Sequence, residues 1–132
     1  MRISVFLAIL IWLIAAANFF VVLYDLDSPG VGLDDLLHFA GGLWLAGLLI
    51  YLFRKFGISL VIGNWILVIA IVLAIGIFWE LGEFIIDVYF EDKLETLHDG
   101  NLDTGLDLFF DLLGATIFLL WQRRLLLKAA KS

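Results

Sequence analysis

Four long apolar stretches, separated by shorter polar segments, account for most of the chain. Each stretch reaches the roughly 20 predominantly apolar residues that an α-helix needs to cross the hydrocarbon core of a bilayer. The pattern therefore predicts four membrane-spanning helices, over about residues 3–24, 34–53, 60–90 and 103–122. The third stretch is longer than one crossing requires, so we expect its acidic end to project beyond the hydrocarbon or the helix to tilt.

The first stretch also has features of a secretory signal peptide. Arg2 precedes an apolar run, and three alanines at positions 15–17 resemble a cleavage site. The apolar run continues from Phe19 to Leu23, however, beyond these alanines. This continuation favours an uncleaved first span over a signal peptide.

Composition supports a membrane protein. The 132 residues are 64% hydrophobic, well above the apolar share of a soluble domain, and the mean hydropathy is +1.09. The length is that of one domain, and the absence of cysteine excludes disulfides and thiolate metal sites. We expect an all-α, integral membrane four-helix bundle that forms a single domain over residues 1–132. Its predicted partner is the lipid bilayer, with no nucleic acid.

Small residues indicate where the predicted helices approach one another. The second span contains Gly41, Gly42, Ala46 and Gly47, and the fourth contains Gly114. Residues of this size allow close packing of membrane helices because no bulky side chain separates the backbones. We expect Gly42 and Gly114 to lie at such contacts.

The basic residues fall almost entirely on one side of the predicted spans. Of 8 lysines and arginines, only Lys93 lies in a connection on the other side. Because positive residues concentrate in cytoplasmic segments, the pattern predicts a multi-pass plasma-membrane protein with both termini cytoplasmic. The 14 acidic residues then lie in the two outer connections or in the outer parts of the spans. The remaining basic residues are Arg2, Arg54, Lys55, Arg123, Arg124, Lys128 and Lys131.

The third predicted span carries acidic residues within its apolar sequence. Glu80, Glu83 and Asp87 are spaced i, i+3 and i+7, which brings their side chains to one face of an α-helix. Charged residues inside a membrane span are costly and commonly functional. This face is therefore a candidate site.

The fourth predicted span carries a second acidic face. Asp103, Asp107 and Asp111 recur every four residues, so they share one side of the helix. At a rise of about 1.5 Å per residue, Asp107 and Asp111 lie roughly 6 and 12 Å inward of Asp103. Glu80 lies at a similar depth in the third span, and His38 enters from the outer end of the second span. We expect one carboxylate cluster open to the outside, with His38 beside it.

Some of these acids have a simpler interpretation. Asp34 and Asp103 stand at predicted helix starts, where an aspartate commonly accepts backbone N–H groups as a cap. Asp87 could reach water at the membrane interface. These three are additional candidates for the site. The principal candidates for metal ligands are His38, Glu80, Glu83, Asp107 and Asp111.

Carboxylates at this depth need a counter-charge. One charged side chain in a span costs on the order of 3 kcal/mol on insertion scales, and no lysine or arginine of this chain falls at the depth of these acids. Three kinds of occupant remain: protons, a divalent metal ion, or a cationic group brought by a ligand or another subunit. Oxygen ligands with one imidazole suit Mg, Mn, Ca or Zn.

Three short motifs follow one another along the chain: Asp34-x-x-x-His38, Glu80, and Asp107-x-x-x-Asp111-x-x-Gly114-Ala115. In this order they resemble the VanZ-like family and a related group of small membrane proteins of unknown function. The resemblance covers nearly the whole chain and implies a link to glycopeptide (teicoplanin) resistance and the cell envelope, without a known reaction. VanZ-like proteins typically carry Lys, Gln and Asn where this chain has Asp35, Glu83 and Asp111. The site of this chain is therefore more acidic.

Three classes of function remain open from the sequence. The first is an extracytoplasmic-facing site that binds a divalent cation and acts on, or recognises, a cell-envelope lipid or glycan group. The second is proton- or ion-coupled movement of a small solute or lipid through the acidic region. The third is a non-catalytic membrane interaction subunit whose partner supplies the cations. The sequence leaves open whether any reaction is catalysed, and which oligomer forms.

Overall fold

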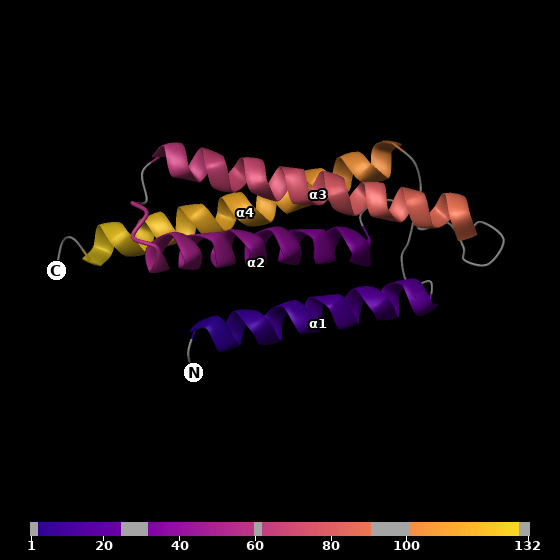
Figure 1. Cartoon of the computed structure of the whole chain (residues 1–132), viewed down its shortest axis with the longest axis horizontal. Helices are drawn as coiled ribbons and strands as arrows, with labels where there is room; N and C mark the ends of the chain where they lie inside the picture. Colours follow the sequence, from indigo (N-terminus) through magenta and orange to yellow (C-terminus); the bar gives the residue numbers. More distant parts are fainter. Residues whose placement is uncertain (1–2, 25–31, 60–61, 91–100, 130–132) are drawn as a thin grey trace.

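The computed structural model describes residues 3–24, 32–59, 62–90 and 101–129, and these residues form four helices with no strand among them (Figure 1). The helices are α1 (Ile3–Tyr24), α2 (Leu33–Lys55), α3 (Ile62–Phe90) and α4 (Asn101–Ala129). The all-helical prediction is confirmed, and the described residues of each predicted span lie within one helix. Residues 60 and 61 of the third predicted span lie outside the described residues. α4 continues about two turns beyond the predicted end at residue 122. The polar segments predicted at residues 25–31 and 91–100 lie outside the described residues.

Three of the helices contain segments long and apolar enough to cross a membrane. These segments are Leu33–Lys55 in α2, Gly63–Ile85 in α3 and Asp103–Leu127 in α4. α1 contains a shorter apolar segment, Val5–Val21. The crossing of the bilayer by α1 therefore stays a prediction.

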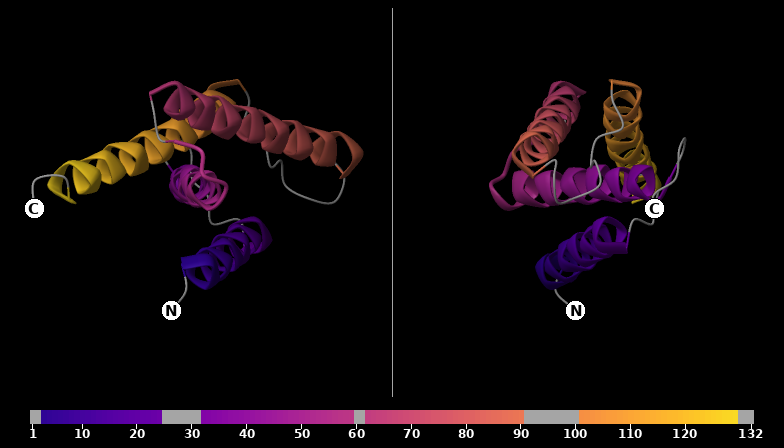
Figure 2. Two further views of the ribbon diagram at one scale, coloured as in Figure 1. Left: turned by 60° about the vertical axis from the view of Figure 1, so that its left-hand side comes forward. Right: turned by 90° about the vertical axis from the view of Figure 1, so that its right-hand side faces the viewer.

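α2 lies at the centre of the arrangement. It packs most extensively against α4, and α3 packs against both α2 and α4. Among the described residues α1 approaches only α2, and both views in Figure 2 place α2 between α1 and the other two helices. The side chain of Trp44 fastens α1 to α2, because its Nε1–H donates a 2.7 Å hydrogen bond to the carbonyl oxygen of Leu7.

Two glycines bring α2 and α4 into backbone contact. A Cβ atom on Gly42 would collide with the carbonyl group of Asp111, and one on Gly114 would collide with the carbonyl oxygen of Phe39. Neither position therefore has room for a side chain, and the predicted close approach is confirmed. Because His38 lies one turn before Gly42, this contact also brings the acids of α4 next to the imidazole.

The main apolar core and the buried acids occupy opposite halves of the bundle. The apolar core lies toward the α2–α3 connection and contains Ala46, Ile50, Phe53, Val68, Val72, Ala115 and Leu119. The buried acids lie in the other half, near the start of α2 and α4. The beginning of α1 and the end of α4 lie at the apolar-core end (Figure 1). Exposed Arg54, Lys55, Arg123 and Arg124 also belong to that end.

Candidate functional site

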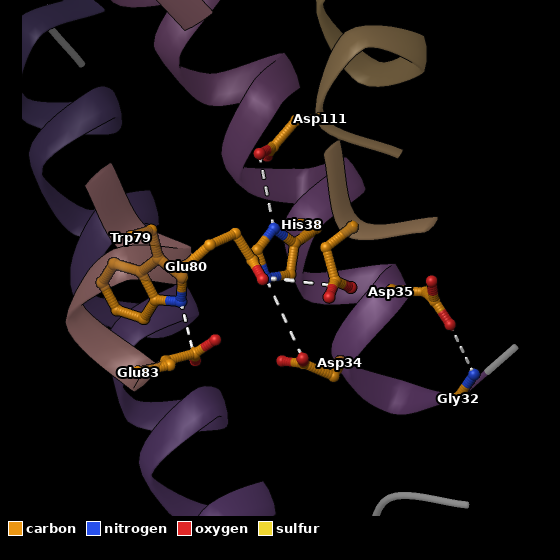
Figure 3. Close-up of polar contacts among 9 residues, drawn as sticks. Gly32, Asp34, Asp35, His38, Trp79, Glu80, Glu83 and Asp111 are labelled. Atoms are coloured by element: carbon orange, nitrogen blue, oxygen red, sulfur yellow. Dashed lines mark hydrogen bonds and ion pairs between the residues drawn. The ribbon is translucent and has the colours of Figure 1, made fainter. Parts of the chain in front are cut away.

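His38 is the centre of the buried polar residues. Its side chain is almost fully buried, and its two ring nitrogens face different acids (Figure 3). Nδ1 lies 3.4 Å from Oδ2 of Asp111. Nε2 lies 3.9 Å from Oδ2 of Asp34, 3.7 Å from Oε1 of Glu80 and 3.9 Å from Oδ1 of Asp107. One imidazole therefore meets carboxylates from α2, α3 and α4.

Helical spacing explains how these side chains converge. Asp34 and His38 are four residues apart on α2, and Asp107 and Asp111 are four residues apart on α4, so each pair projects from one face. The glycine contact between α2 and α4 places these two faces together. Glu80 completes the group from α3. The exposed fractions of Glu80, Asp107 and Asp111 are 6%, 2% and 7%, which puts their carboxyl groups inside the protein.

The distances on the Nε2 side are those of groups around a shared cation. Separations of 3.7–3.9 Å exceed those of hydrogen bonds. Two atoms that each lie about 2.0–2.6 Å from one ion can be up to roughly 4–5 Å apart. The ligand atoms of Asp34, His38 and Asp107 lie within 4.8 Å of one another, and so do those of His38, Glu80 and Glu83. Each of these two groups, which share His38, could hold a metal ion.

Asp111 has a separate place on the other side of the imidazole. When Nδ1–H donates to Asp111, the lone pair of Nε2 points at the three remaining carboxylates. A carboxylate that fixes one imidazole nitrogen while the other binds a metal is a common arrangement around metal-bound histidines. The structure thus separates Asp111, predicted to be a direct ligand, from the carboxylates on the Nε2 side.

The carboxylate of Glu80 has no hydrogen-bond partner in the part of the chain that the structure describes. Both of its oxygens are buried there without one. Nε2 of His38 lies 3.7 Å from Oε1 of Glu80. Burying an ionised carboxylate without hydrogen bonds costs several kcal/mol. A proton or a cation between these groups would remove that cost.

Glu83 occupies the edge of the group. It lies one turn beyond Glu80, is half-buried, and accepts a 2.8 Å hydrogen bond from Nε1–H of Trp79. Trp79 is four residues earlier on the same helix, so the pair is held within α3. Glu83 can therefore reach the Nε2 side of His38 while remaining partly in contact with the outside (Figure 3).

The predicted capping role of Asp34 is wrong. The N-cap residue of α2 is Gly32, so Asp34 lies inside the first turn and faces His38. Its neighbour Asp35 accepts a 2.7 Å hydrogen bond from the backbone N–H of Gly32. Asp103 lies in the first turn of α4 and is half-buried, outside both possible metal-binding groups. Asp87 belongs to α3, but its side chain lies outside the described part of the chain.

Two residues that the sequence did not single out support the site. Asp35 is only 3% exposed and fixes the start of α2, one turn before His38. Gly76 lies against the carboxylate of Asp111, and a Cβ atom there would collide with Oδ2 of Asp111 and with Leu108. The sequence signal that could have identified Gly76 is its position four residues before Glu80 on the same predicted helix. No sequence signal distinguishes the cap Asp35 from the neighbouring Asp34.

Comparison with known proteins supports the membrane assignment. A family model described as "Predicted membrane protein (DUF2238)" matches residues 1–128. No curated protein matches the chain. No solved structure matches it either. The resemblance to VanZ-like proteins is not confirmed by these comparisons and stays a prediction.

Proposed function

The chain belongs to the DUF2238 family of predicted membrane proteins, and we propose that it binds one divalent cation at a site within the membrane. We call this site the carboxylate–histidine cluster. It consists of Nε2 of His38 and the carboxylates of Asp34, Glu80, Asp107 and, from the edge, Glu83. Asp111 orients the imidazole through Nδ1.

The observation that carries this proposal is the environment of Glu80. Its carboxylate is buried without a hydrogen-bond partner among the described residues and faces the nitrogen that also faces Asp34 and Asp107. In the described part of the chain, Glu80, Asp107 and Asp111 each pair with His38. A divalent cation offsets the repulsion between the carboxylates and supplies the missing partner of Glu80.

The ligand set indicates the class of metal. Carboxylate oxygens are hard ligands, and one imidazole nitrogen adds a borderline ligand. Mg, Mn, Ca and Zn all accept oxygen ligands, and Mn and Zn also bind imidazole readily. We therefore place the cation among these four.

We further propose that the site faces the extracytoplasmic side of the plasma membrane, with α1 as a fourth span. The distribution of basic residues supports this orientation, because Arg54, Lys55, Arg123 and Arg124 gather at the end opposite the cluster. On that side the bound cation would act on, or recognise, a lipid or glycan group of the cell envelope. The resemblance to VanZ-like proteins, which are linked to the envelope, supports this choice of ligand.

Metal analysis of the purified protein tests the cation site. The parent protein should retain about one divalent ion per chain after dialysis, and Glu80→Gln should lower the bound metal because an amide is a poorer ligand. Asp35→Asn is the matched control, since Asp35 is equally buried one turn from His38 but points at Gly32. Loss of metal in both variants, or in neither, would contradict the assignment.

A second candidate function is proton-coupled movement of a small solute. It is favoured by one observation, namely that both ring nitrogens of His38 face carboxylates on different helices. A histidine between two acids can pass a proton from one to the other. Parent protein that holds no metal, and whose reconstituted vesicles take up protons, would select this function instead.

A further inference from the structure

A cavity of about 460 Å³ lies between α1, α2 and α3, next to the carboxylate–histidine cluster. Its volume is in the range of small-molecule binding sites in proteins. α1 forms one wall and α3 the other, and α2 forms the floor. The apolar part of the lining includes Ile11, Ile14, Leu45, Leu48, Val72 and Ile75.

The cavity changes character along its length. His38 lies toward one end, and the carboxylate of Asp111 lies about one turn further in, beside Gly41 and Gly76. Asn18 of α1 also lines the cavity. From His38 to Leu48 the floor runs for ten residues of α2, on the order of 15 Å at the helical rise, and becomes apolar. The polar end is nearest the start of α2 and the apolar end lies deeper in the bundle. This change from a polar end to an apolar interior matches the polarity of an amphiphile inserted in one leaflet of a bilayer.

The charges at the polar end select the head group. Asp111 lines the cavity, and Asp34, Glu80 and Asp107 lie behind it around His38. The lysines and arginines whose side chains the structure describes, among them Arg54 and Arg123, are at the opposite end of the helices. An anionic head group would meet several acids around the one imidazole of His38, whereas a cationic head group finds complementary charge.

We propose that this cavity, defined as the α1–α3 groove, binds a membrane amphiphile whose hydrocarbon chain lies between α1 and α3 and whose primary ammonium group contacts Asp111. An ammonium group has three donors and no acceptor, so it can bond the carboxylate of Asp111 and leave two donors for other oxygens. Gly41 and Gly76, which flank this carboxylate, also line the cavity, and the absence of a side chain at Gly76 is what gives the carboxylate of Asp111 its place there.

The inference concerns a ligand site beside the proposed cation site and does not depend on a bound metal. His38 is shared, but the metal is proposed on its Nε2 side and the ammonium group on the Nδ1 side, next to Asp111. Binding measured in the presence of a chelator therefore tests the groove alone. Metal analysis of the chelator-free protein tests the cluster alone.

The experiment measures saturable binding of dodecylamine to the full chain in phosphatidylcholine nanodiscs that contain a chelator, with empty nanodiscs as background. Dodecyl phosphate is the control with the same chain and an anionic head group. Ethylamine is the control with the same ammonium group and a short chain. Dodecylamine should bind about tenfold or more tightly than either control. Dodecyl phosphate loses the charge-assisted hydrogen bond to Asp111, and ethylamine loses the buried hydrocarbon chain. Equal affinity for the amine and the phosphate would overturn the head group, and equal affinity for the short amine would overturn the groove.

Two substitutions on α1 test where the hydrocarbon chain of dodecylamine binds. Ala15 and Ala16 are both exposed, but Ala15 lines the groove and Ala16 does not. Ala15→Phe should abolish saturable binding of dodecylamine because the ring fills the groove, and Ala16→Phe should bind like the parent. Retention of binding by Ala15→Phe would contradict the proposal. Asp111→Asn is a further test. It should reduce the affinity for dodecylamine about tenfold, and its affinity for dodecyl phosphate should be no lower than that of the parent.

Discussion

Asp111 on α4 lies 3.4 Å from Nδ1 of His38 on α2 and so directs the other ring nitrogen toward three further carboxylates. The pair is possible because Gly42 and Gly114 let the two helices touch through their backbones. The same contact that packs the bundle therefore also sets the orientation of the imidazole. This relationship makes Asp111 a positioning residue for the proposed cation site.

Asp111→Asn should weaken metal binding without abolishing it. The amide can still accept from Nδ1–H but carries no charge, so the imidazole becomes a weaker and less fixed ligand. We expect a loss of about 10-fold in metal affinity, at the lower end of the range for outer-shell partners of metal-bound histidines. Calorimetric titration of the detergent-solubilised protein measures it. His38→Gln, which removes the ligand itself, should lose more, and a smaller loss in His38→Gln than in Asp111→Asn would contradict the assigned roles.

Glu80→Gln should have opposite effects on stability with and without metal. In chelator, removing one buried carboxylate charge relieves repulsion and desolvation, and we expect a gain of about 1–3 kcal/mol in the free energy of unfolding, the scale of the penalty for an unsatisfied buried polar group. With saturating metal the parent should gain, by about 2.7 kcal/mol at a metal concentration 100 times its dissociation constant, and the variant should gain less. Thermal unfolding under both conditions checks this. Destabilisation by Glu80→Gln in chelator would mean that the charge already has a partner.

Gly42→Ala should destabilise the bundle because the new methyl group would meet the backbone of Asp111. Overpacking of this kind costs about 1–3 kcal/mol, and more where neighbouring backbone must move. Gly82→Ala on α3 is the matched control, since nothing lies within 4 Å of a Cβ atom there, and alanine favours a helix over glycine. Melting temperatures in the same detergent decide the point. A variant of Gly42 that melts with the control would show that α2 and α4 are not in backbone contact.

Membrane orientation can be measured by labelling single introduced cysteines, because the chain contains no cysteine of its own. A single cysteine introduced between residues 91 and 100 should react with an impermeant reagent from outside intact cells, and Ser59→Cys in the α2–α3 connection should not. The expectation follows from the basic residues Arg54 and Lys55 beside that connection. Labelling of Ser59→Cys alone would invert the topology and turn the cluster toward the cytoplasm.

The helices and their closest contact follow from the sequence. Apolar stretches of membrane-spanning length gave the four helices, because the backbone of a chain within a bilayer must satisfy its own hydrogen bonds. Gly42 and Gly114 marked the close contact because small residues are what such contacts require. Helical spacing also placed Asp107 and Asp111 on one face, and the structure brings that face to His38.

The details of the site depend on the rotation and separation of helices, which periodicity does not determine. The sequence predicts Asp34 as the cap, but the start of α2 at Leu33 makes Asp35 the residue that accepts from the backbone N–H of Gly32. The separation of Asp111 from the other acids depends on which ring nitrogen each one meets. Gly76 matters only because α3 passes beside the carboxylate of Asp111. The contacts of Asp111 with His38 and Gly76 join residues far apart in the sequence, whereas the contact of Asp35 with Gly32 is local but depends on where α2 begins.

The central claim, a cation held by His38 and carboxylates, is tested most directly by pulsed electron paramagnetic resonance of protein loaded with Mn²⁺. The parent should bind about one Mn²⁺ per chain, with nitrogen coupling from one directly bound imidazole and otherwise oxygen ligands. His38→Gln should remove that coupling, and Asp35→Asn should retain it. Mn²⁺ that binds without nitrogen coupling, or the same signal in His38→Gln, would contradict the assignment of the site.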